Sequence, residues 1–240
     1  MSQNNCFDFA YVKQKVFDKK CDFEYNVYKI WTLCPRGDSV PDSNTKFTKT
    51  IISAAVKLFK EKGYENVSVN DICKEAGIAR STFYLTFAGK KEIIDKIISD
   101  VRLDREDFFG DFIIAENDFE RMWILCNRYL TIAISFGPKL LGSLLRLELL
   151  GELDIMGMVH QVDEWMIKLL GNSQKTGVIL NSEPAERLAP LGVDLAYYST
   201  YEWCKKMGDF NLRQVVRRRA EEIYNVAPEW RMSEENLKML

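Results

Sequence analysis

The sequence predicts an all-α protein in which a tri-helical helix-turn-helix unit is followed by a larger helical domain. From Lys46 onward, apolar residues recur with the spacing of a helix face and not with the alternation of a half-buried strand. Glycines stand where two of the early helical segments end. Together these observations favour helices from Lys46 onward and argue against a parallel sheet.

The composition excludes several classes of protein. With 47% hydrophobic and 28% charged residues among 240, the chain is typical of a globular protein with one large or two small domains. The net charge of −2 excludes a chain that is basic throughout but is compatible with a local basic face. The six cysteines form no C-x-x-C pair and there is one histidine, so we expect neither a disulfide framework nor a metal site. We also find no nucleophile–histidine–acid set and no glycine-rich phosphate loop, so we expect no catalytic residues and no cofactor.

Two further patterns bear on the cellular location of the protein and on its N-terminal segment. No segment holds the ~18 uninterrupted apolar residues of a membrane span, and residues 1–6 lack the apolar stretch of a secretory signal. We therefore expect a cytoplasmic protein without membrane contact. Residues 1–45 are expected to form an N-terminal extension that ends in a linker at 35–45. Residues 1–34 are rich in aromatic side chains, and three interpretations stay open: they pack on the protein, bind a partner, or precede the true start.

The first helix is predicted at about 48–62. Ile51, Ala55 and Phe59 fall on one face of it, as the core-facing side of an amphipathic helix requires. Gly63 stands where a left-handed residue would end the helix.

The second and third predicted helices are short and are joined by a glycine turn. The second begins at Ser68, with Asp71 three residues later as in a capping box, and runs to Ala76. Gly77 ends it, and the third helix spans about 80–87. Two short helices joined by such a turn form a helix-turn-helix.

The spacing of apolar residues separates the two faces of this unit. Ile72, Ala76, Ile78 and Phe83 can face inward and hold the two helices at a steep angle. The other face of the third helix carries groups that reach phosphates and base edges in a major groove. It comprises Arg80, Ser81, Thr82, Tyr84, Leu85 and Thr86.

Two lysines, Lys90 and Lys91, begin the next predicted helix. The helix dipole disfavours a cation at this end by about 0.3–1 kcal/mol. A bound phosphate would remove the conflict and use the free backbone N–H groups. In the alternative interpretation, Glu92 compensates the dipole and both lysines are merely solvated.

Residues 48–98 resemble the N-terminal domain of the TetR family of transcriptional regulators. The matching residues follow in order at the family's spacing: Ala54, Ala55, Leu58, Phe59, Gly63, Tyr64, Ser68, Val69, Asp71, Ile72, Glu75, Ala76, Gly77, Ile78, Ser81, Thr82, Phe83, Tyr84, Phe87 and Lys90. The rest of the chain matches only in its general helical character, as is usual for the variable sensor domain of this family.

The resemblance implies a DNA-binding domain at 46–92, a helical effector-binding and dimerisation domain at 93–228 and a tail at 229–240. It implies that Ser68 and Lys90 contact phosphates and that Tyr84 reaches the DNA backbone. The complete set of expected DNA-binding residues is Lys49, Ser68, Ala79, Arg80, Ser81, Thr82, Tyr84, Thr86 and Lys90.

The sequence departs from the family pattern at three positions. Ala79 replaces a common serine and Thr86 a common histidine, so the base specificity is not carried over from the family. Gly89 replaces a common serine or asparagine cap, which costs only a few tenths of a kcal/mol because glycine is a tolerable N-cap.

The C-terminal block is predicted as helices at about 117–135, 138–150, 154–171, 184–208 and 210–226. In the family, the last two build a two-fold dimer, so the resemblance implies a homodimer on a palindromic operator in double-stranded DNA. The last helix carries an arginine run that is either a DNA patch or, as we favour, a solvated face paired with acids. The run comprises Arg213, Arg217, Arg218 and Arg219, and the acids are Glu221 and Glu222.

The resemblance also implies a small-molecule pocket in this domain. Aromatic walls with few polar groups suit a lipophilic or aromatic effector, and a buried Glu148 would favour a cationic one. The candidate ligand-binding residues are Trp123, Asn127, Phe136, Glu148, Trp165, Tyr197 and Tyr201, and ordinary core packing is the alternative for each.

The predicted function is therefore that of a sequence-specific DNA-binding regulator, expected to be a repressor that its ligand releases. The alternative is a protein-interaction module of the same fold, a coactivator or scaffold without productive operator binding.

Overall fold

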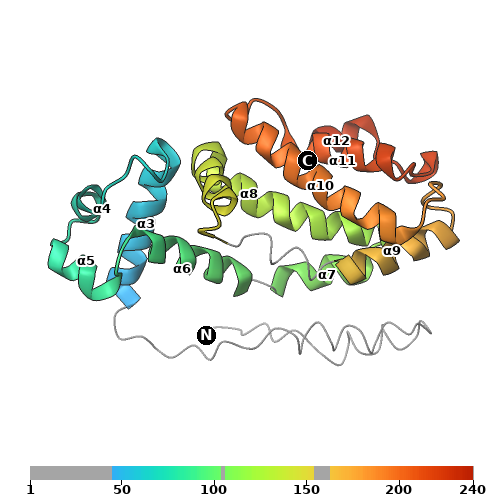
Figure 1. The fold of residues 1–240 in the computed structure, drawn as a ribbon. Coiled ribbons are helices and arrows are strands. Elements are labelled where there is room, and N and C mark those ends of the chain that lie inside the picture. Colours follow the sequence, from blue (N-terminus) through green and yellow to red (C-terminus); the bar gives the residue numbers. More distant parts are fainter. Residues whose placement is uncertain (1–44, 104–105, 154–162, 240) are drawn as a thin grey trace, which may run out of the picture. The chain divides into compact units, whose positions relative to one another are not determined.

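The computed structural model describes residues 45–103, 106–153 and 163–239, most of which lie in helices (Figure 1). The described residues contain no β-strand, and one isolated antiparallel bridge joins Ile179 to Val226. The predicted all-α class is confirmed. The predicted extension at 1–45 lies outside the described residues, apart from Thr45.

Four helices form the N-terminal part of the described chain: α3 (Thr45–Lys62), α4 (Val69–Ala76), α5 (Arg80–Thr86) and α6 (Lys90–Leu103). They match the predicted elements to within a few residues. The predicted capping box is confirmed, because the Asp71 N–H donates to Ser68 Oγ at 3.1 Å and the Ser68 N–H donates to Asp71 Oδ2 at 2.9 Å. Gly77 ends α4 with φ of 65°, a left-handed conformation that glycine adopts without steric cost.

The core of this part is continuous with the next domain. Ile51, Phe59, Ile72 and Phe83 are fully buried together, as their spacing predicts. The same cluster includes three leucines of α8 (Asp118–Leu149), namely Leu140, Leu144 and Leu147. Helices α3 and α8 are therefore packed against each other through this shared core.

The remaining elements are α7 (Glu106–Ile114), α8, α9 (Asp163–Lys175), α10 (Ala185–Lys205), α11 (Leu212–Ile223), a 3₁₀ turn (Pro228–Trp230) and α12 (Glu234–Met239). Helix α10 packs on α8, α9 and α11. Helix α7 was not among the predicted elements, and α9 continues past the predicted end at Gly171.

Helix α8 is two helical segments joined at a break. Gly137 has φ of 74° and ψ of 162°, and Pro138 follows it at the start of the second segment, where a missing N–H is tolerated. These segments correspond to the predicted helices at 117–135 and 138–150. Among the described residues, α8 alone is long and apolar enough for a membrane span by length and composition; 44% of its most apolar window is buried inside this protein.

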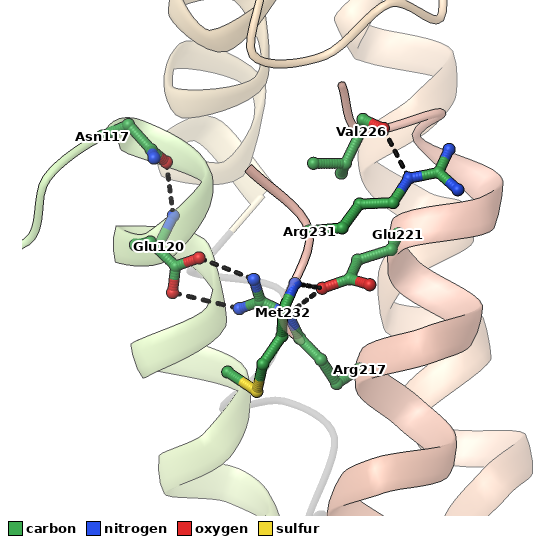
Figure 2. A network of polar contacts seen from close by, with 7 residues as sticks. All are labelled: Asn117, Glu120, Arg217, Glu221, Val226, Arg231 and Met232. Carbon is green, nitrogen blue, oxygen red and sulfur yellow. Dashed lines mark hydrogen bonds and ion pairs between the residues drawn. The ribbon is translucent and has the colours of Figure 1, made fainter. Parts of the chain in front are cut away.

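A buried charge network joins α8 to α11 (Figure 2). The guanidinium of Arg217, only 1% exposed, binds both carboxylate oxygens of Glu120, at 2.6 and 3.0 Å, and Glu221 at 2.6 Å. The predicted pairing with Glu221 is therefore confirmed, but a solvated position is wrong for Arg217. The cause is that α11 packs on α8 and α10, which removes one side of the arginine run from water.

Candidate nucleic-acid interface

Helix α5 presents one face to the core and one to solvent. Phe83 is fully buried and Phe87 is 5% exposed, and these two rings fix the rotation of the helix about its axis. Four residues of the helix are exposed: Arg80, Ser81, Tyr84 and Leu85. The predicted outer face is thus exposed at four of its six positions.

The two threonines lie at the edge of this face. Thr82 and Thr86 are half-buried, and the Thr86 hydroxyl donates to the Thr82 carbonyl at 3.1 Å. Ala79 is the N-cap of α5 and makes no side-chain cap bond.

Arg80 and Tyr84 support each other. The Arg80 guanidinium lies 6.0 Å from the centroid of the Tyr84 ring, within the range of a cation–π contact. The Tyr84 ring in turn meets Phe83 edge-on, with centroids 5.4 Å apart. A cation and an aromatic hydroxyl are therefore held together on the outer face, in a form suited to a phosphate.

Lys49 lies apart from α5. It is exposed on α3 and lines a groove of about 400 Å³ together with residues of α3 and the end of α4. In this groove Lys57 and Glu75 form an exposed ion pair at 2.6 Å. Ser68 is exposed at the start of α4. The structure thus brings together the predicted contacts of α5 but leaves Lys49 on a neighbouring helix.

Lys90 points into the protein. Its Nζ donates to the carbonyl oxygens of Tyr64 at 2.7 Å, Val67 at 3.0 Å and Glu65 at 3.5 Å, and it lies 4.2 Å from the centroid of the Tyr64 ring. Burial lowers the pKa of Lys90, and the nearby Glu65 carboxylate opposes this shift. All three ammonium donors are directed at the turn after α3, so this geometry favours a positioning role over the expected phosphate contact.

The expected conflict with the dipole of α6 is resolved inside the chain. Glu92 Oε2 accepts the Ala88 N–H at 2.6 Å, and Lys91 pairs with Asp95 at 3.1 Å. The compensation by Glu92 is confirmed, whereas Lys90 is not merely solvated.

Neither of the cavities of about 430 and 400 Å³ is lined by any of the seven predicted ligand residues. Trp123 is buried, Phe136 is half-buried against two core clusters, and Asn127 accepts a hydrogen bond from Arg213 Nε at 2.9 Å. Tyr201 is 46% exposed on the outer side of α10, away from the core. Glu148, Trp165 and Tyr197 are half-buried.

A cavity of about 430 Å³ opens elsewhere, between the start of α8 and the C-terminal segment. Its lining includes Asn117, Glu120, Arg217, Trp230 and Met232, and none of the seven predicted ligand residues. The sequence drew attention to Arg217 only as part of a basic run. No sequence pattern predicts that residues 230–232 line this cavity. They are held beside it by tertiary hydrogen bonds, such as the one that the Met232 N–H donates to Glu221 Oε1 at 3.0 Å (Figure 2).

The amino-acid sequence of residues 51–97 matches a known family, described as the bacterial regulatory proteins of the tetR family. A transcriptional regulator of Bacillus subtilis, YvdT, is 31% identical over 80 residues, which cover 33% of this chain and 41% of that protein. The biofilm operon negative regulator IcaR of Staphylococcus epidermidis is 28% identical over 107 residues, 39% of this chain and 56% of IcaR. The chain thus spans about half the length of these relatives.

Similarity of fold extends further along the chain. The transcriptional regulator FadR of Bacillus subtilis, solved in complex with stearoyl-CoA, has a TM-score of 0.55 at 19% identity, covering 73% of this chain and 97% of FadR. The helical part after α6 therefore has the fold of such regulators. Residues 51–97 thus match the tetR family of bacterial regulatory proteins, and the likeness to FadR beyond them is a likeness of fold.

Proposed function

We propose that the protein is a sequence-specific DNA-binding transcriptional regulator of the cytoplasm, a repressor that a small-molecule effector releases from a palindromic operator. The observation that carries the proposal is the outer face of α5, where Arg80, Ser81 and Tyr84 are exposed on a helix whose other side is fixed by Phe83. A helix of this kind fits the major groove, and its donors suit phosphates and base edges. IcaR is named a negative regulator, which supports repression rather than activation.

A homodimer would place two copies of α5 on one duplex. Helix α10 exposes Leu191, Tyr198 and Tyr201, at 45%, 59% and 46%, and their spacing of seven and three residues puts them on one stripe. Such a stripe is suited to two-fold helix packing. Tyr198→Glu is expected to shift the mass measured by light scattering from dimer to monomer, while Tyr84→Glu on α5 leaves it unchanged. A dimer that persists in Tyr198→Glu and Leu191→Glu contradicts this surface.

The effector signal would pass through the second segment of α8. After the break at Gly137, Lys139 Nζ donates to the Glu61 carbonyl at 2.7 Å and Arg146 pairs with Glu65 at 3.6 Å. An effector that prefers one position of this segment would shift the population of DNA-competent spacings. The stearoyl-CoA bound by FadR supports a lipophilic effector, so stearoyl-CoA is the first probe for release from DNA.

The test of the DNA-binding proposal starts from duplexes selected from a random pool. Fluorescence anisotropy of the best duplex is expected to show an affinity that falls steeply with salt. Arg80→Ala should weaken binding about 10- to 100-fold, in line with about 1–3 kcal/mol for a specific arginine contact. Lys168→Ala, which removes an exposed cation of α9, is the control and should bind as the wild type does.

The outcome that contradicts the proposal is a protein that binds no duplex in a salt-dependent manner. The alternative of a protein-interaction module is not favoured, because the relatives that match this domain are named transcriptional regulators.

A further inference from the structure

Leu85 is the most exposed large hydrophobic side chain among the described residues, at 82%. It stands on α5 next to Tyr84 and four residues after Ser81, so it shares a ridge of the helix with the Ser81 hydroxyl. It cannot turn inward, because Phe83 and Phe87 already occupy the core side of this helix. The free protein therefore holds an aliphatic group in water at the centre of its outer face.

The chemistry around Leu85 identifies what would cover it. Helix α5 carries Arg80 and no acidic residue, so no carboxylate of this helix repels a phosphate. Arg80 and Tyr84 form the neighbouring ridge, at four residues' spacing. In the major groove, thymine is the base that presents a C5-methyl group, and an apolar side chain is the partner that recognises it.

We propose that Leu85 reads the C5-methyl group of a thymine in the major groove and so sets one position of each operator half-site. The proposal rests on the proposed DNA-binding function and adds a specificity-determining residue to it. Ser81 and Arg80 supply donors to polar atoms on either side, and Leu85 supplies the apolar contact that a cytosine or a uracil cannot return.

The experiment replaces each thymine of the selected operator by deoxyuridine, in both half-sites at once. Deoxyuridine keeps every polar atom of thymine and lacks only the methyl group. At one position the wild-type protein should lose roughly 3- to 10-fold in affinity per half-site, the size expected when one methyl group is no longer buried. The salt dependence of binding should stay the same, since no phosphate contact changes.

Two variants assign this effect to Leu85. Leu85→Ala should weaken binding to the thymine operator and should no longer respond to deoxyuridine at that position. Leu85→Met keeps an apolar side chain of similar reach and should retain the response. Leu149→Ala, a control leucine that is 77% exposed at the end of α8, should behave as the wild type.

The outcomes separate this inference from the function beneath it. If the wild type binds the operator with steep salt dependence but no deoxyuridine position matters, or if Leu85→Ala keeps the full response, the reading by Leu85 is overturned and the regulator stands. If Leu85→Ala binds DNA as the wild type does but no longer binds a protein partner or forms a dimer, the reading of thymine by Leu85 is likewise overturned. If no duplex is bound at all, both the function and the inference fail.

Discussion

Ser143 of α8 donates its hydroxyl hydrogen to Glu65 Oε2 at 2.7 Å, and so ties α8 to the turn that follows α3. The same oxygen accepts the Tyr64 N–H at 3.2 Å. Ser143 is only 7% exposed, whereas its partner Glu65 lies at the surface. One buried hydroxyl therefore serves both partners at the boundary between the helix-turn-helix and the helical domain.

Ser143→Ala should destabilise the fold by about 1–3 kcal/mol, because it leaves the Tyr64 N–H buried without an acceptor. Urea unfolding followed by circular dichroism measures the change. Ser135→Ala, an exposed serine of the same helix, is the control and should stay within about 0.5 kcal/mol of the wild type. Equal unfolding midpoints for the two variants would show that the junction contributes nothing.

Lys90→Met should weaken operator binding without changing its salt dependence, because the Lys90 ammonium holds carbonyl oxygens of the turn and not a phosphate. Loss of a true phosphate contact would instead reduce the slope of log K against log salt by about 0.9. Anisotropy titrations at several salt concentrations distinguish the two. Lys91→Met, which removes only an exposed pair with Asp95, serves as the comparison. If the slope falls in Lys90→Met and not in Lys91→Met, Lys90 contacts a phosphate, as the sequence predicts.

Arg217→Met should cost about 3–5 kcal/mol, because Glu120 and Glu221 would be left as buried or half-buried charges without their cation. Arg218→Met, one residue away, removes an exposed pair with Glu234 and should cost less than about 1 kcal/mol. Chemical unfolding of both variants gives the difference. If the two losses are similar, Arg217 is better solvated than its 1% exposure indicates.

Gly192→Ala should be destabilising by about 1–3 kcal/mol, the usual cost of overpacking a core. A Cβ at this position would lie 2.0 Å from the Tyr224 hydroxyl oxygen. Tyr224→Phe removes that oxygen and should rescue part of the loss, since the next ring atom is 3.2 Å away. Gly110→Ala, whose Cβ would meet no atom within 4 Å, is the matched control for a glycine in a helix. If Gly192→Ala combined with Tyr224→Phe is no more stable than Gly192→Ala alone, the clash with the Tyr224 hydroxyl is not the cause of the destabilisation.

The amino-acid sequence by itself determined the features that depend on neighbours along the chain. The capping pair Ser68–Asp71, the left-handed Gly77 and the inward position of Phe83 are set by hydrogen bonds and helical periodicity within a few residues. For this reason the helix-turn-helix and the exposed side of α5 could be predicted before any tertiary contact was known.

Only the tertiary structure decided whether each long side chain is exposed to solvent or bound by another part of the chain. Lys90 and Arg217 look like surface cations in the sequence. In the fold, however, the Tyr64 carbonyl binds Lys90 from 26 residues away and the Glu120 carboxylate binds Arg217 from 97 residues away. Arg217 is thereby buried and Lys90 half-buried. Tyr201 lies on the outer side of α10, although its residue type suits a pocket equally well. Periodicity fixes the face of a helix that a residue occupies, but the helices that arrive at that face decide whether a charge meets solvent, a carbonyl or a carboxylate.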